Sequence, residues 1–99
     1  MEEVTIEQLG KNVVEEVLRA RKMWGTEFDL KNTLNDWVSY INSYTAKASR
    51  MGAPKEEVVT NLRKAAGLAL SALYHAENDL LAPRHYETQQ RPTSLPDIE

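Results

Sequence analysis

The side chains best suited to chemistry gather in residues 33–50 and in the segment WGTEFDLKN that precedes them. Asp36, Tyr40, Ser43 and Lys47 recur at three- and four-residue steps, which places them along one strip of a helix. A carboxylate, a phenol, a hydroxyl and an amine would then face the same way. A binding site has this pattern, and so does the ordinary solvated flank of a helix.

A second group of candidate residues lies in the connection before that helix. Trp24, Phe28 and Asp29 come close together after the stop that Gly25 supplies. Two large aromatic rings beside a carboxylate can form the wall of a pocket. They can equally seal the end of a helix bundle, which is the commoner role for exposed aromatic residues near a helix end.

Hydrophobic periodicity predicts an all-α fold for the chain. Thr5 with Gln8, and Thr33 with Asp36, have the form of capping boxes, which mark the start of a helix. The charges of the first helix run from acidic to basic, a solvated pattern that needs no ligand. We expect a three-helix bundle with helices at about 6–23, 34–50 and 54–79, the last starting at Pro54, and an extended C-terminal tail.

The third expected helix is apolar over an unusually wide arc. Two stripes run along it side by side, one through Val58 and Leu62 and the other through Val59 and Ala66. Such a helix is either central in the fold or carries a subunit interface. Gly67 costs about 1 kcal/mol of helix stability relative to alanine, which indicates a packing reason for it.

Length and composition limit the function classes. The 99 residues fit one domain, which we place at residues 1–81, with residues 82–99 and their three prolines as the tail. The net charge of -3 gives no overall attraction for DNA or RNA, and the lack of cysteine excludes thiolate nucleophiles and Cys-based metal sites. No apolar run is long enough to span a membrane, so we expect a cytoplasmic protein without membrane contact.

A small helical chain with surplus apolar surface commonly buries that surface against a copy of itself. We therefore expect a homo-oligomer, either a dimer, a tetramer or a larger assembly.

The segments WGTEFDLKNTLNDWVSYINSYTAKA and NLRKAAGLALSALYHAE resemble the small MazG-like, all-α nucleoside triphosphate pyrophosphohydrolases, particularly the compact forms that phages often encode. The shared features are a WG-containing acidic loop, a DW at the next helix start and an alanine-rich later helix that ends in an acid. The similarity covers roughly residues 15–80. It implies an oligomeric helical fold in which EExxE and ExxD boxes hold Mg²⁺ ions that bridge a triphosphate.

The metal-binding boxes of that superfamily are eroded in this chain. The second helix offers Asp36 but no later acid, because Tyr40 and Ser43 stand where carboxylates would be sought. Glu77 and Asp79 are two residues apart, so they form no ExxD box and point to different helix faces. Several carboxylates are needed to balance two metals and a developing phosphate charge. The fold would then persist while hydrolysis is lost.

Our leading expectation is a nucleotide-binding protein of MazG-like fold that sequesters or senses a nucleotide, a signalling nucleotide among the candidates, with little or no hydrolysis. Aromatic rings would stack on the base and cations would meet the phosphates, with no cofactor required. We expect the pocket between the second and third helices or across a subunit boundary. The candidate ligand-binding residues are Trp24, Trp37, Tyr40, Tyr44, Lys47, Arg50, Arg63 and Lys64.

Two alternatives stay open. One is a Mg²⁺-dependent nucleoside triphosphate pyrophosphohydrolase that releases a monophosphate and pyrophosphate from a reduced, one-metal site. Its candidate ligands are Asp29, Asp36, Glu77 and Asp79. The other alternative is a non-catalytic helical oligomer for protein interaction, in which all these polar residues are surface.

Overall fold

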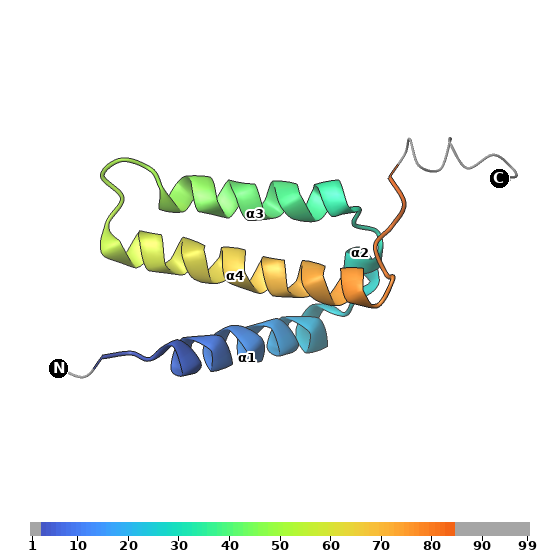
Figure 1. The fold of residues 1–99 in the computed structure, drawn as a ribbon, viewed down its shortest axis with the longest axis horizontal. Coiled ribbons are helices and arrows are strands. Elements are labelled where there is room, and N and C mark those ends of the chain that lie inside the picture. Colours follow the sequence, from blue (N-terminus) through green and yellow to red (C-terminus); the bar gives the residue numbers. More distant parts are fainter. Residues whose placement is uncertain (1–2, 85–99) are drawn as a thin grey trace, which may run out of the picture.

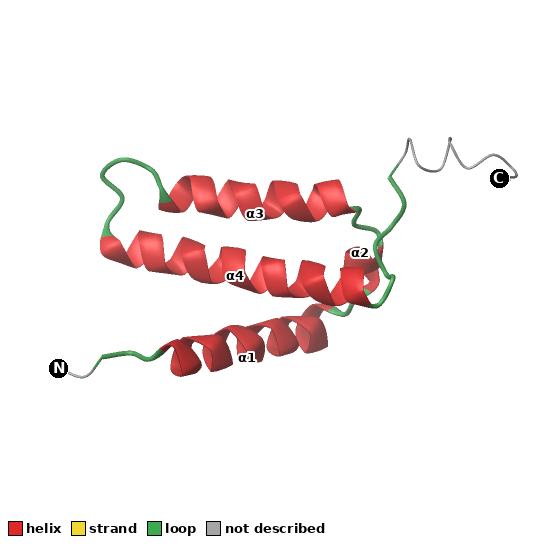
Figure 2. Cartoon of the chain, in the orientation of Figure 1, coloured by secondary structure: helices red, strands yellow, loops and turns green. Residues whose placement is uncertain are grey.

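The computed structural model of the chain describes residues 3–84, and within that range it contains helices and no strand (Figures 1 and 2). This confirms the all-α prediction for the described part of the chain. None of the helices there combines the length and the apolar character that crossing a membrane would require. The helices are α1 (Ile6–Trp24), α2 (Glu27–Leu30), α3 (Leu34–Ala48) and α4 (Lys55–Glu77).

Both predicted capping boxes are present. The backbone N–H of Gln8 donates to Thr5 Oγ1 at 3.1 Å, and the N–H of Thr5 donates back to Gln8 Oε1 at 3.0 Å. Thr33 and Asp36 make the same reciprocal pair at the start of α3. Each box satisfies N–H groups that a helix start leaves without an intrahelical partner. The starts of α1 and α3 are therefore determined by local sequence.

The later helix boundaries differ slightly from those predicted. The second long helix ends at Ala48 and not at residue 50, and the chain then turns through Gly52 at φ 81°. Pro54 is the N-cap of α4 rather than its first helical residue. The C-terminal end of α4 comes at residue 77 instead of 79, because Asp79 adopts φ 56°, a left-handed conformation that aspartate tolerates better than most residues.

The short helix α2 was not predicted. We expected residues 26–32 to be an irregular connection, but Glu27–Leu30 forms one helical turn after the glycine stop at Gly25. Four residues are too few for hydrophobic periodicity to be visible in the sequence. The turn is important because it places Asp29 at the end of the layer where α1 and α3 are joined (Figure 1).

The three long helices lie in a row with α4 in the middle, rather than in a closed bundle (Figure 1). α4 packs against α3 on one side and against α1 on the other, and no Cα atom of α1 comes within 8 Å of one in α3. α1 and α4 converge toward the end where α1 terminates (Figure 1). The wide apolar arc of α4 is thus explained in part by its central position.

The core is a narrow seam between α3 and α4. Its apolar members are Trp37, Ala48 and Ala65, and its polar members are Asn61 and His75. Both polar side chains have backbone partners on α4 itself. The amide nitrogen of Asn61 donates to the carbonyl of Glu57 at 2.9 Å, and His75 Nδ1 lies 2.8 Å from the carbonyl oxygen of Ser71. Because a carbonyl can only accept, Nδ1 carries the hydrogen in that contact.

The chain that follows α4 returns to the start of α3. The N–H of Ala82 donates to the carbonyl of Asn32 at 3.0 Å, and Ala82 forms a parallel bridge with Thr33. The folded part of the chain therefore continues past residue 81, where we had placed the domain boundary. The rest of the expected extended tail, residues 85–99, lies outside the described residues.

Gly67 faces α1 near the middle of α4. A Cβ added there would come 3.4 Å from Val17 Cγ2, whereas a Cβ added at Gly10 in α1 would meet no atom of the described residues within 4 Å. We predict that Gly10→Ala raises the free energy of unfolding by about 1 kcal/mol, because alanine is the better helix former. Gly67→Ala should gain less, because its methyl group presses on Val17. Urea unfolding followed by far-UV circular dichroism measures both, and equal gains would contradict a packing cost at Gly67.

Candidate functional site

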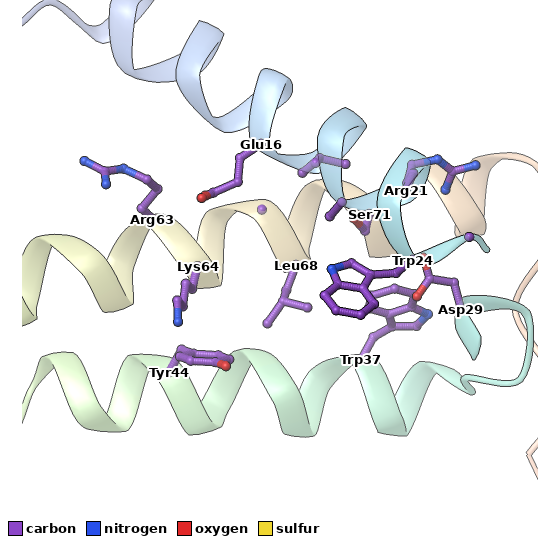
Figure 3. Close-up of a pocket in the computed structure, with 14 residues that line it drawn as sticks. Glu16, Arg21, Trp24, Asp29, Trp37, Tyr44, Arg63, Lys64, Leu68 and Ser71 are labelled. Carbon is purple, nitrogen blue, oxygen red and sulfur yellow. The ribbon is translucent and has the colours of Figure 1, made fainter. Parts of the chain in front are cut away.

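A cleft of about 330 Å³ lies between α1 and α4, with α3 forming its floor (Figure 3). That volume is near the lower end of the range of about 300–1,000 Å³ that is typical of small-molecule sites. The lining residues come from all four helices and from the glycine after α1. They are Glu16, Val17, Ala20, Arg21, Trp24, Gly25, Asp29, Trp37, Tyr44, Arg63, Lys64, Gly67, Leu68 and Ser71.

The cleft exists because small residues face each other across the two helices. On α4, Gly67 and Ser71 are one turn apart and leave a hollow below α1. On α1, Val17, Ala20 and Trp24 recur at three- and four-residue steps and line the opposite wall. Only at its rim and ends does the cleft carry long side chains.

Two tryptophans lie at one end of the cleft (Figure 3). Trp37 is 2% exposed, and its ring is held by His75 at a centroid distance of 5.2 Å and by Tyr40 in an edge contact at 6.4 Å. Trp24, from the last turn of α1, is 76% exposed. One indole is therefore fixed by packing and the other is open to solvent. Trp24 therefore supplies the aromatic surface that a planar ligand can reach, whereas Trp37 belongs to the buried core beside it.

The indole N–H of Trp37 is buried and has no hydrogen-bond partner within residues 3–84. Leaving such a donor unsatisfied costs about 1–3 kcal/mol, so it normally has a protein, water or ligand partner. Asp29 lines the same end of the cleft from α2 (Figure 3). Asp29 therefore gives this end of the cleft an acceptor for a polar ligand edge.

Basic side chains lie toward the other end of the cleft. Arg63 and Lys64 project from α4, and Lys64 Nζ is 5.4 Å from the ring centroid of Tyr44 (Figure 3). A third cation, Arg21, stacks over the ring of Tyr74 at 4.8 Å and thereby ties α1 to α4. Three cations line the cleft against two carboxylates, Glu16 and Asp29. The cleft is locally cationic in a chain whose net charge is -3.

The structure brings together five of the eight residues that we expected to bind a ligand, namely Trp24, Trp37, Tyr44, Arg63 and Lys64. Their cleft lies mainly between the first and third long helices, not between the second and third. The seam between α3 and α4 holds buried residues, among them Trp37 and Ala65.

The other three expected residues lie outside this cleft. The hydroxyl of Tyr40 donates to Asn32 Oδ1 at 3.3 Å, near the start of α3. Lys47 Nζ lies 4.9 Å from the ring centroid of Tyr44 and so approaches the cleft only through that ring. Arg50 forms an ion pair with Glu57 at 2.8 Å, across the connection from α3 to α4.

Several lining residues were missed by the sequence analysis. We had assigned the charges of the first helix, including Glu16 and Arg21, to a solvated flank, but both line the cleft. Gly67 was the available signal, because a glycine inside a long helix indicates a close neighbour. The sequence does not show that this neighbour is α1, or that Ser71 extends the same hollow.

The carboxylates do not fit the metal site that the MazG-like resemblance implies. Asp36 Oδ2 accepts the N–H of Thr33 at 3.0 Å, so this side chain caps α3. Glu77 and Asp79 lie at the end of α4 and do not line the cleft. The described residues contain no group of three or more histidine, aspartate or glutamate side chains that could hold a metal ion. Asp29 is the one member of the expected set that lines the cleft.

We predict that Asp36→Ala lowers the free energy of unfolding by about 0.5–2 kcal/mol, the usual cost of losing a capping interaction. Thr33→Ala removes the reciprocal bond and should cost about the same. Both losses should be equal with and without Mg²⁺ in thermal unfolding followed by circular dichroism. A Mg²⁺-dependent stabilisation of the wild type that disappears only in Asp36→Ala would instead make Asp36 a metal ligand.

The chemistry of the cleft has to be inferred from its own residues. It combines indole surface, a buried donor, a neighbouring carboxylate and a group of cations in one hollow. No family model matches the chain, and neither a curated protein nor a solved structure is significantly similar to it.

Proposed function

We propose that the chain binds a nucleotide in the cleft between α1 and α4 and retains it with little or no hydrolysis. One observation carries the proposal: the same cleft has indole surface at one end and the cations Arg63 and Lys64 toward the other (Figure 3). A nucleotide has the matching polarity, since a flat base is joined through a sugar to an anionic phosphate. The MazG-like resemblance of the sequence points to the same ligand class.

The base would lie against Trp24, at the end of the cleft that the buried Trp37 fixes by packing on His75. Trp24 can cover a bound ring from the α1 side because it is largely exposed. Stacking of a base on an aromatic side chain is worth about 1–3 kcal/mol. The carboxylate of Asp29 would add a polar contact to the base or the sugar.

The phosphates would be held by the basic end of the cleft. Neither Arg63 nor Lys64 forms an ion pair within the described part of the chain, so both charges are available to an anion. The arginine can make a bidentate contact with phosphate oxygens, and the lysine acts as a point charge. Such charge-assisted hydrogen bonds are stronger than bonds between neutral groups.

We place binding ahead of hydrolysis because of the carboxylates. Cleavage of a triphosphate in the MazG-like manner needs clustered acids to hold the metal ions that balance the phosphate charge. In residues 3–84 the cleft offers Glu16 and Asp29, which belong to different helices, and the described chain has no larger cluster. These two side chains are better suited to contacts with hydroxyl or amino groups of a ligand.

We also propose that the protein is a homo-oligomer. No residue of α1 is buried in the single chain, although its apolar residues are spaced for one buried face. Ile6 is 86% exposed, and Leu18 and Phe28 are also largely exposed. Contact with another copy would remove such surface from water, at a gain of about 25 cal/mol for each Å² of apolar area.

The first experiment is to incubate the pure protein with Mg²⁺ and a mixture of nucleoside triphosphates and cyclic dinucleotides, and then to analyse the filtrate before and after heat denaturation. We expect one nucleotide to be depleted from the filtrate and recovered intact on denaturation. A monophosphate with pyrophosphate in the filtrate would establish the hydrolase. If every nucleotide passed through unchanged, the proposed function would be wrong and an interaction protein would remain.

For the nucleotide identified in this way, Arg63→Ala and Lys64→Ala should each weaken binding roughly 10- to 150-fold, because each removes one charge-assisted contact worth about 1.5–3 kcal/mol. Lys22→Ala is the matched control, since Lys22 is in the last turn of α1 but does not line the cleft. Isothermal titration calorimetry measures the three dissociation constants. Equal weakening in all three variants would indicate attraction by overall charge and not a site at the cleft.

A further inference from the structure

One face of α4 is left without a partner in the single chain. The side of α4 toward α3 carries Asn61, Ala65 and His75, which are buried. The side toward α1 carries Lys64, Gly67 and Ser71, which line the cleft. A further apolar stripe, which we call the third face of α4, runs about a third of a turn from the side toward α3 and almost half a turn from the side toward α1. It consists of Val59, Leu62, Ala66, Ala69, Leu73 and Ala76.

Every residue of the third face is exposed. The two largest side chains, Leu62 and Leu73, are 51% and 56% exposed. Their steps of three and four residues are those of a helix-packing seam. With 23 residues, α4 is about 35 Å long, so the stripe is continuous over several turns. An apolar surface of this length and regularity marks an interaction site rather than scattered exposed residues.

The central four side chains of the third face, Leu, Ala, Ala and Leu, have the same order from either end. Around a midpoint between Gly67 and Leu68, Leu62 corresponds to Leu73 and Ala66 corresponds to Ala69. Two antiparallel copies of α4 would therefore meet with leucines opposite leucines and alanines at the centre. Alanines at the crossing point let two helix backbones come close. This self-complementarity is what a twofold symmetric interface requires, since the same patch serves both copies.

Charges at the two ends of α4 fit the same arrangement. Lys55 begins the helix and Glu77 ends it, and both are exposed on the side of the third face. In an antiparallel pair, Lys55 would lie beside Glu77 of the partner subunit at each end. This pairing also accounts for an acid at the C-terminal end of α4, where the helix dipole disfavours negative charge. Antiparallel alignment places each helix end beside the opposite end of its partner's dipole.

We propose that two copies of the chain associate through the third face of α4 in an antiparallel, twofold symmetric pair. The inference rests on the homo-oligomer proposed above, but it does not depend on nucleotide binding. The cleft is formed on a different side of α4, toward α1, so the pair leaves it open.

The oligomeric state tests the proposal. Sedimentation equilibrium of the full chain should give a dimer or a multiple of it, and Leu62→Glu and Leu73→Glu should each lower the assembly mass by at least half. Met51→Glu is the matched control, because Met51 is an apolar residue that is 95% exposed but lies in the connection between α3 and α4. Circular dichroism checks that the helix content is unchanged. An unaltered mass in both α4 variants would overturn the α4 interface and leave the homo-oligomer standing, whereas a monomeric wild type would overturn both.

Disulfide trapping tests the alignment in case the glutamate variants fail to fold. The native chain has no cysteine, so each new thiol is the only one present. Val59→Cys mixed with Ala76→Cys should form a covalent dimer on mild oxidation, because these positions face each other in the antiparallel pair. Either variant alone should stay uncrosslinked, since its two thiols would be about 25 Å apart along the helices. Crosslinking of each variant with itself would mean a parallel pair and would refute the proposal.

Discussion

The packing of the Trp37 indole on His75 is the contact on which the described structure depends most. It is formed where α3, the end of α4 and the returning chain at Ala82 come together. Trp37 and His75 are the two largest fully buried side chains, and the rest of the buried core consists of two alanines and an asparagine. The same indole lines the cleft, and its buried N–H has no hydrogen-bond partner within residues 3–84. The core contact therefore also fixes one end of the cleft.

The position of α4 explains why a single copy of this chain buries so little. A central helix has α3 on one side and α1 on another, and two neighbours cannot cover an arc that is apolar nearly all round. Burial of apolar area is the main favourable term in folding, so an uncovered apolar face leaves the isolated chain less stable. Association with a copy of the chain would bury that face and add the missing stability. Folding would then depend on protein concentration. In this view α4 serves the fold, the cleft and the assembly with three different faces.

The cleft owes its character to side chains from different helices. Along α3, the polar strip separates in the folded protein: Asp36 caps the helix and Tyr40 bonds to Asn32. The α3 residues that line the cleft are Trp37 and Tyr44. The cations come from α1 and α4, and the short helix α2 contributes Asp29. Charge and shape in the cleft favour an anionic ligand with a flat ring, and the scattered carboxylates give little basis for metal-assisted cleavage.

The sequence by itself determined the helical class, the three long helices and the starts of α1 and α3, because capping boxes and hydrophobic periodicity act within a few residues. Five of the eight candidate binding residues, all named from their chemistry, line the cleft. The sequence did not indicate which helix would face them. Only the tertiary structure placed α1 against Gly67, formed α2, and turned Glu16 and Arg21 toward a cleft. The periodicity of a helix tells which residues share a face, whereas the neighbour of that face is decided by packing between segments far apart in the chain.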